Sequence, residues 1–134
     1  MNAEAVARRL FETLQETARL PPEEWPDAVP EIWAEDAVYR EDPRLIGAGV
    51  YTGREEIARC WTGYGEVFSD VEFDVTRIER IGDRVLATVV IRTRAGEMPI
   101  EHEWGYVVET RGEQVASLTA YFDPDQAREA AAAA

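Results

Sequence analysis

The sequence predicts an α+β domain, with helices in the first half of the chain and a meander of long strands in the second. Apolar residues follow a helical period in the first half and alternate in period two from Asp70 onward. Turn signals at Gly82-Asp83, Ala95-Gly96 and Arg111-Gly112-Glu113 divide the second half into strands. Helices followed by consecutive strands are typical of the α+β class. With 134 residues, 46% of them hydrophobic, the chain is expected to form one domain over residues 1–134.

Three elements are expected before the first glycine-rich loop. The first helix carries an unbroken apolar stripe with charged residues on its other side, and Pro21-Pro22 ends it. The second helix is irregular and uses Trp25 and Trp33 as apolar contacts. A short strand follows, and Asp42-Pro43 ends it. The expected bounds are residues 3–18 for the first helix, about 23–34 for the second, and 36–41 for the strand.

A further helix is expected after the loop Gly47-Ala48-Gly49. Thr52 and Glu55 have the spacing of a capping box, in which both side chains satisfy free backbone N–H groups at a helix start. The stripe of this helix consists of Ile57, Trp61, Tyr64 and Phe68.

Four strands are expected in the second half. The first alternates from Val71 to Val75 and then changes phase, which predicts a β-bulge near Thr76 and Arg77. The second is apolar on both faces in its middle, which indicates a central strand. The second, third and fourth strands are expected at residues 85–93, 98–110 and 115–122. An alanine-rich tail follows at residues 126–134.

Composition excludes several function classes. The formal net charge of −13 argues against binding of nucleic acids and anionic membranes, which need clustered Lys and Arg. The single cysteine, Cys60, cannot form an internal disulfide and sits on a helical stripe, so we expect a small buried hydrophobic residue. The N-terminus shows no signal peptide and no stretch of membrane-spanning length, so a cytoplasmic protein is expected.

The segment 101–109 bears most directly on function. It alternates like a strand, with Glu101, Glu103 and Glu109 on one face and His102, Trp104, Tyr106 and Val108 on the other. Such a strand usually exposes its acids and buries its aromatic residues. In a curved sheet around a ligand cavity, the carboxylates can instead face a substrate.

Three segments of the chain resemble the SnoaL-like branch of the nuclear transport factor 2-like superfamily. They are Trp33–Pro43, the segment Tyr51–Ile57 that opens a helix, and the final hairpin from Gly105 to Asp123. Together they span nearly the whole chain in the family's order. The resemblance implies a cone, in which a curved mixed sheet is closed by N-terminal helices around an apolar cavity. Its members include ketosteroid isomerases, polyketide cyclases, epoxide hydrolases and proteins that only bind or associate.

The catalytic sets of known members are mostly absent. The acid that epoxide hydrolases and polyketide cyclases carry on the last strand corresponds to Ala120, and the hydrolase Arg and Asp correspond to Val89 and Ile91. Of the ketosteroid isomerase set, the oxyanion-hole aspartate corresponds to Gly105, and only the base has a counterpart, Asp42.

The resemblance implies a different polar set. With the family's inward face, Glu101 and Glu103 face the cavity, opposite Tyr39 and Glu41, while His102, Trp104 and Tyr106 lie outside, on a surface that family homodimers often bury. The hypothesis is an enzyme that acts on an apolar, polyketide- or terpenoid-like substrate by cofactor-free acid–base chemistry, as an isomerase, cyclase or dehydratase. In this hypothesis Glu103 is the base, because burial in the cavity desolvates its carboxylate and raises its pKa. Glu101 or Glu41 raises that pKa further by like-charge repulsion. Tyr39 donates a hydrogen bond to the developing enolate.

Alternatives remain open for each group of residues. Glu101 and Glu103 can be solvent-facing, and the protein can be a non-catalytic ligand-binding or dimeric association domain. His102, the only histidine, can be a base or a structural residue, but no metal site is expected because metal sites need three or four converging ligands. Aromatic residues that can stack on a ligand, or simply form core, are Phe11, Trp33, Trp61, Tyr64 and Phe68.

Overall fold

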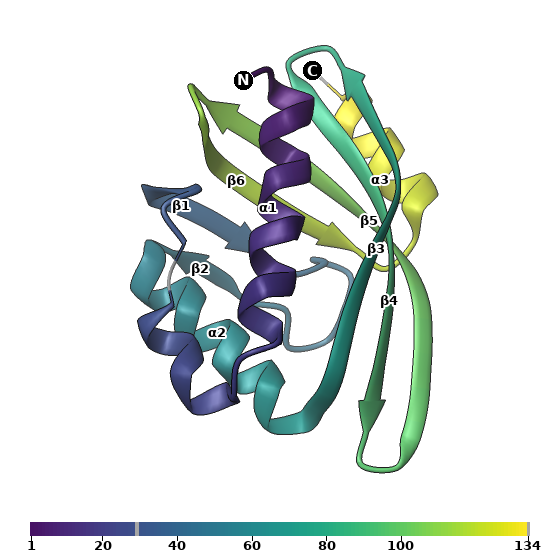
Figure 1. The fold of residues 1–134 in the computed structure, drawn as a ribbon. Coiled ribbons are helices and arrows are strands. Elements are labelled where there is room, and N and C mark those ends of the chain that lie inside the picture. Colours follow the sequence, from purple (N-terminus) through teal and green to yellow (C-terminus); the bar gives the residue numbers. More distant parts are fainter. Residues whose placement is uncertain (29, 134) are drawn as a thin grey trace.

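A six-stranded sheet, covered by helices on both faces, organises the chain (Figure 1). The computed structural model describes residues 1–28 and 30–133. None of the helices within these ranges is long and apolar enough to cross a membrane. The elements are helix α1 (Ala3–Ala18), the 3₁₀ helix η1 (Pro22–Asp27), strands β1 (Trp33–Arg40) and β2 (Val50–Thr52), helix α2 (Arg54–Val67), strands β3 (Phe68–Ile81), β4 (Arg84–Ala95), β5 (Met98–Arg111) and β6 (Gln114–Tyr121), and helix α3 (Pro124–Ala132).

The sheet is mixed and strongly curved. Its strand order is β2-β1-β6-β5-β4-β3, and every neighbouring pair is antiparallel except β1 and β6. The register of β3 against β4 shifts between Val75 and Arg77, which confirms the predicted bulge, and again between Ser69 and Glu72. Bulges bend a strand and increase its twist, and the long β3–β4 ribbon curves beside α1 (Figure 1). The expected α+β cone is therefore confirmed.

Helix α1 covers the concave face and has the predicted bounds. It buries an apolar stripe that includes Leu10 and Phe11. Its Gln15 side chain is bonded to β3, where Nε2 donates to the Val71 carbonyl at 2.9 Å and Oε1 accepts from the Phe73 N–H at 2.8 Å. These two bonds attach the helix to the edge strand of the sheet.

Helix α3 packs on the opposite, convex face, where the sequence predicted only a tail. The Asp123 side chain caps it by accepting from the Asp125 N–H at 2.9 Å, and Pro124 occupies its first turn. Ala127 is buried there against Leu86 and Val107. The helix comes so close to β5 that a Cβ at Gly105 would lie 2.5 Å from the Ala127 Cβ.

Two other boundaries differ from the sequence prediction. The second helix stops at Asp27, and Trp33 opens β1, because prolines at 26 and 30 prevent a continuous helix. The capping box does not form, since Gly53 with φ 88° precedes α2 and no side chain caps it. The Arg54 guanidinium donates instead to the Trp33 carbonyl, at 2.9 Å from Nε and 2.6 Å from Nη2.

Replacing Gly105 with alanine should destabilise the fold by about 1–3 kcal/mol, because the added methyl overlaps Ala127 and the backbone of Pro124. The control is Gly63→Ala in α2, whose added Cβ meets nothing within 4 Å. A glycine-to-alanine change inside a helix should leave stability equal or raise it by up to about 1 kcal/mol. Urea unfolding of both variants measures the difference, and a Gly105→Ala protein as stable as the parent contradicts the packing argument.

Candidate functional site

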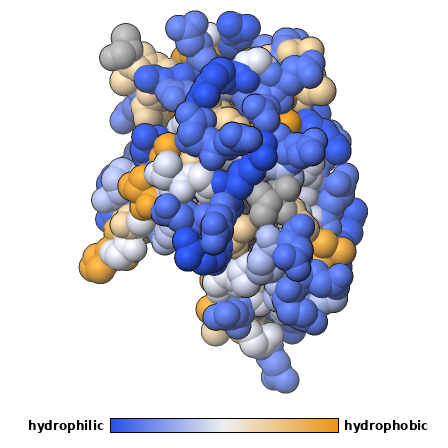
Figure 2. Space-filling model, turned by 90° about the vertical axis from the view of Figure 1, so that its left-hand side faces the viewer, coloured by the Kyte–Doolittle hydropathy of each residue, from blue (hydrophilic) through white to orange (hydrophobic). Residues whose placement is uncertain are grey.

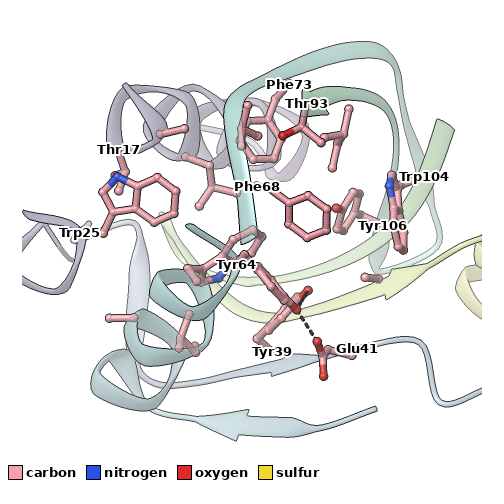
Figure 3. Close-up of a pocket in the computed structure, with 18 of the residues that line it drawn as sticks. Thr17, Trp25, Tyr39, Glu41, Tyr64, Phe68, Phe73, Thr93, Trp104 and Tyr106 are labelled. Carbon is pink, nitrogen blue, oxygen red and sulfur yellow. Dashed lines mark hydrogen bonds between the residues drawn. The ribbon is translucent and has the colours of Figure 1, made fainter. Parts of the chain in front are cut away.

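A cavity of about 350 Å³ lies between the concave face of the sheet and the helices α1, η1 and α2 (Figure 3). Its wall is unusually aromatic, since all four tryptophans, three of the five tyrosines and three of the four phenylalanines of the chain contribute. The outer surface contrasts with it, and the face shown in Figure 2 is mostly hydrophilic with hydrophobic residues in small separate groups. An apolar hollow with few polar groups is the usual form of a small-molecule site.

Strand β5 presents its aromatic face to this cavity. His102, Trp104 and Tyr106 line the hollow, whereas Glu101 and Glu103 are exposed on the convex face. Glu101 forms an ion pair there with Arg92, at 2.5 Å. The predicted inward orientation of Glu101 and Glu103 is therefore wrong.

The physical reason is packing on both sides of β5. On the convex side α3 covers Gly105 and Val107, and on the concave side the Phe11 ring packs edge-on against Tyr106, with the ring centroids 5.2 Å apart. Because side chains alternate along a strand, these contacts also orient the residues before them. The three aromatic residues thus belong to the cavity and not to an outer dimer surface, and the homodimer stays a prediction.

Glu41 supplies the carboxylate of the cavity, and no other carboxylate is found among the described lining residues. It follows β1 directly and is held by three donors, of which Figure 3 shows the hydrogen bond within the cavity wall. Its Oε1 accepts from the Gly49 N–H at 2.8 Å and from the Tyr51 hydroxyl at 3.4 Å, and its Oε2 accepts from the Tyr64 hydroxyl. None of the ion pairs within the described residues involves Glu41.

Tyr39 extends this hydrogen-bonded chain. Its hydroxyl lies 3.2 Å from that of Tyr64. Tyr64 has one hydroxyl proton, and it donates that proton to Glu41, so Tyr39 must be the donor between the two tyrosines. The chain therefore runs from Tyr39 through Tyr64 to Glu41, and both phenolic protons are committed.

The hydroxyls of the tyrosines in and beside the cavity have raised pKa values, and burial is the main cause for Tyr39 and Tyr64. Burial raises the pKa of Tyr39 well above the usual value, and it raises that of Tyr64 strongly. Burial alone raises the pKa of Tyr106. The neighbouring Cys60 is the largest cause that raises the pKa of Tyr51 to about 12, and desolvation and Glu41 add to it.

His102 is fixed at another part of the wall. Its Nε2 lies 2.6 Å from the Phe122 carbonyl oxygen, and its ring stacks on Phe122 with centroids 3.7 Å apart. A carbonyl only accepts, so Nε2 carries a proton and donates it to this oxygen. Within residues 1–28 and 30–133, no three His, Cys, Asp or Glu side chains come together as a metal site would require.

Asp42, the counterpart of the isomerase base, has a structural position. It is 2% exposed, and its two carboxylate oxygens accept from the backbone N–H groups of Arg44 and Phe122, each at 2.9 Å. It is not one of the residues that line the cavity. Asp42 thus ties the end of β1 to the end of β6, beside Glu41.

Four of the five aromatic residues expected at a ligand site do line the cavity: Trp33, Trp61, Tyr64 and Phe68. Phe11 lies behind the wall, packed against Tyr106 and Phe73. Cys60 is half-buried next to these groups, and desolvation raises the pKa of its thiol, which does not favour a nucleophilic role. Trp104 and Tyr106 also line the cavity, although the resemblance implied that this face of β5 lies outside.

Comparisons with known proteins agree with this architecture. The family model described as a SnoaL-like domain matches residues 7–125. The chain belongs to the SnoaL-like family.

Solved structures similar to this SnoaL-like chain share its fold. A nuclear transport factor 2-like protein from Anabaena variabilis has a TM-score of 0.72 at 19% identity and covers 92% of both chains. A protein from Catenulispora acidiphila with a ketosteroid isomerase-like fold, in complex with trimethylamine, has a TM-score of 0.62 at 24% identity over 81% of this chain and 85% of its own. An epoxide hydrolase from M. tuberculosis, of the limonene-epoxide hydrolase type, has a TM-score of 0.59 at 18% identity over 89% and 86%. No curated protein matches the sequence.

The SnoaL-like chain places an inert side chain at a position where the resemblance implied an acid. Ala120 lines the cavity, so that part of the wall carries only a methyl group. Ile91, which corresponds to a hydrolase acid, also lines it. Among the described lining residues, the titratable groups are therefore Glu41, His102 and the tyrosines.

The tyrosines should make the fold sensitive to alkali. Their folded-state pKa values lie above the unfolded value of about 10, so the unfolded chain loses protons first. The stability that these protonated tyrosines contribute is complete below about pH 10 and is lost as pH rises through their folded-state pKa values. For Tyr51 this loss falls between about pH 10 and pH 12. Phenolate absorbance and circular dichroism should therefore change together in this range. Gradual ionisation of all tyrosines in an intact fold contradicts this expectation.

Proposed function

We propose that this SnoaL-like domain is an enzyme that moves a proton on an apolar small molecule, with Glu41 as the proton acceptor. The observation that carries the proposal is a single carboxylate in an aromatic cavity, oriented by three donors and without a cationic partner among the described ion pairs. A positioned carboxylate that reaches a substrate C–H can act as a general base.

The surroundings of Glu41 support this role. Gly49 and Tyr51 hold one oxygen, and Tyr64 holds the other, so the carboxylate has one orientation. Tyr39 orients Tyr64 from behind. A ligand that fills this apolar cavity displaces water from it, which strengthens the electrostatic interactions between Glu41 and that ligand. Isomerisation, cyclisation and dehydration of polyketide- or terpenoid-like compounds all need such a proton transfer and no cofactor.

A non-catalytic ligand-binding domain is the second candidate. The observation that favours it is Ala120, which removes an acid that related enzymes carry from the cavity wall. The two candidates differ in one respect, because a binding domain leaves its ligand chemically unchanged.

Deuterium exchange separates the two candidates. The probe is 1-tetralone, a compact aromatic ketone with an exchangeable C–H beside its carbonyl, and proton NMR in D₂O follows the loss of that signal. The parent protein should accelerate exchange above the buffer rate. Glu41→Gln should lower the protein-catalysed rate by about 10²–10⁴-fold, the usual contribution of a general base.

Glu103→Gln is the matched control, since it makes the same chemical change on the exposed face of β5. It should exchange 1-tetralone like the parent. Binding of the ketone without any accelerated exchange sinks the enzyme proposal and favours the binding domain. Equal losses in both variants show that Glu41 is not the specific base.

A further inference from the structure

Tyr106 carries a hydroxyl for which the described residues supply no hydrogen-bond partner. The side chain is 3% exposed, and the hydroxyl takes part in none of the hydrogen bonds within the described residues. The ring extends from β5 into the cavity (Figure 3). Because this hydroxyl is not fully enclosed by protein, it is accessible from the cavity, where a ligand can accept its proton.

The residues that pair with Tyr106 on the neighbouring strands are small. On β4 and β6 the residues paired with it are Ala87 and Ala120, whose side chains are single methyl groups. Phe11 supports the ring edge-on from α1, at 5.2 Å between centroids and an interplanar angle of 61°. The ring is thus fixed, while the cavity around it remains open to a ligand.

Three other polar groups of the wall are already engaged or enclosed by protein. Tyr39 and Tyr64 have committed their protons to the chain that ends at Glu41. The Trp61 Nε1 also has no partner within the described part of the chain, but this atom is fully buried. The described lining residues include no Lys or Arg, so no permanently cationic side chain there neutralises a negatively charged ligand.

We propose that the Tyr106 hydroxyl donates a hydrogen bond to the carbonyl oxygen of a neutral ligand with an apolar ring system. This inference rests on the proposed function, because it assigns the other half of the same site. Glu41 removes a proton from the carbon next to the carbonyl, the C–H electron pair forms a C=C bond, and the carbonyl π pair moves to oxygen. Tyr106 stabilises the charge that develops there, and Glu41 returns the proton to carbon.

The test compares binding of 1-tetralone with that of tetralin, which has the same ring skeleton without the oxygen, by equilibrium dialysis. Tyr106→Phe should weaken 1-tetralone binding about three- to tenfold, the range for one hydrogen bond, and should leave tetralin binding within about twofold. Tyr121→Phe, outside the cavity lining, is the matched control and should change neither. The infrared carbonyl stretch of bound 1-tetralone should lie at higher frequency in Tyr106→Phe than in the parent.

Equal effects of Tyr106→Phe on both probes, an unchanged carbonyl stretch, or no binding of 1-tetralone overturns the inference. The Glu41→Gln protein distinguishes failure of the Tyr106 hydrogen bond from failure of proton transfer by Glu41. It should still bind 1-tetralone with the parent's carbonyl stretch. If the parent does not accelerate deuterium exchange but Tyr106→Phe still shifts the carbonyl stretch of bound 1-tetralone, proton transfer is refuted. The assignment of Tyr106 as the hydrogen-bond donor then stays in place.

Discussion

The close contact between Gly105 and α3 is the constraint on which the cavity depends. A side chain at Gly105 would meet Ala127 at 2.5 Å, so this position must face the helix and have no Cβ. Because β5 alternates, Trp104 and Tyr106 then face inward and Glu103 faces solvent. One helix–strand contact on the outside thus determines which chemical groups line the inside.

The elements that follow a local pattern could be predicted from the sequence. The stripe of α1 gave its bounds, and the phase change after Val75 gave the bulge in β3. The boundary at Trp33 could not be found in this way, because the strand residues Trp33 and Ala34 also fit the apolar spacing of a helix. Helix α3 was missed because the burial of Ala127 depends on a glycine 22 positions earlier in the chain, which no local period reveals.

The candidate site could be predicted only in part, for a similar reason. Tyr39, Glu41 and Tyr64 were identifiable as polar or aromatic groups of the right elements, but their hydrogen bonds join positions more than 20 residues apart. The alternation of β5 defined its two faces without saying which one turns inward. Gly105 within an aromatic strand, together with an alanine-rich segment after it, was the available signal that a helix covers the other face.

Charge connects the composition of the whole chain with the chemistry of this cavity. The net charge of −13 produces a negative potential around the protein, which lowers the local concentration of anions near it. Inside, Glu41 meets no cationic side chain among the described lining residues, and an aromatic wall lowers the dielectric around it. An anionic ligand is therefore disfavoured both on approach and on binding. A neutral ligand avoids both costs, and it gains from the apolar area that the ten aromatic side chains of the wall can cover.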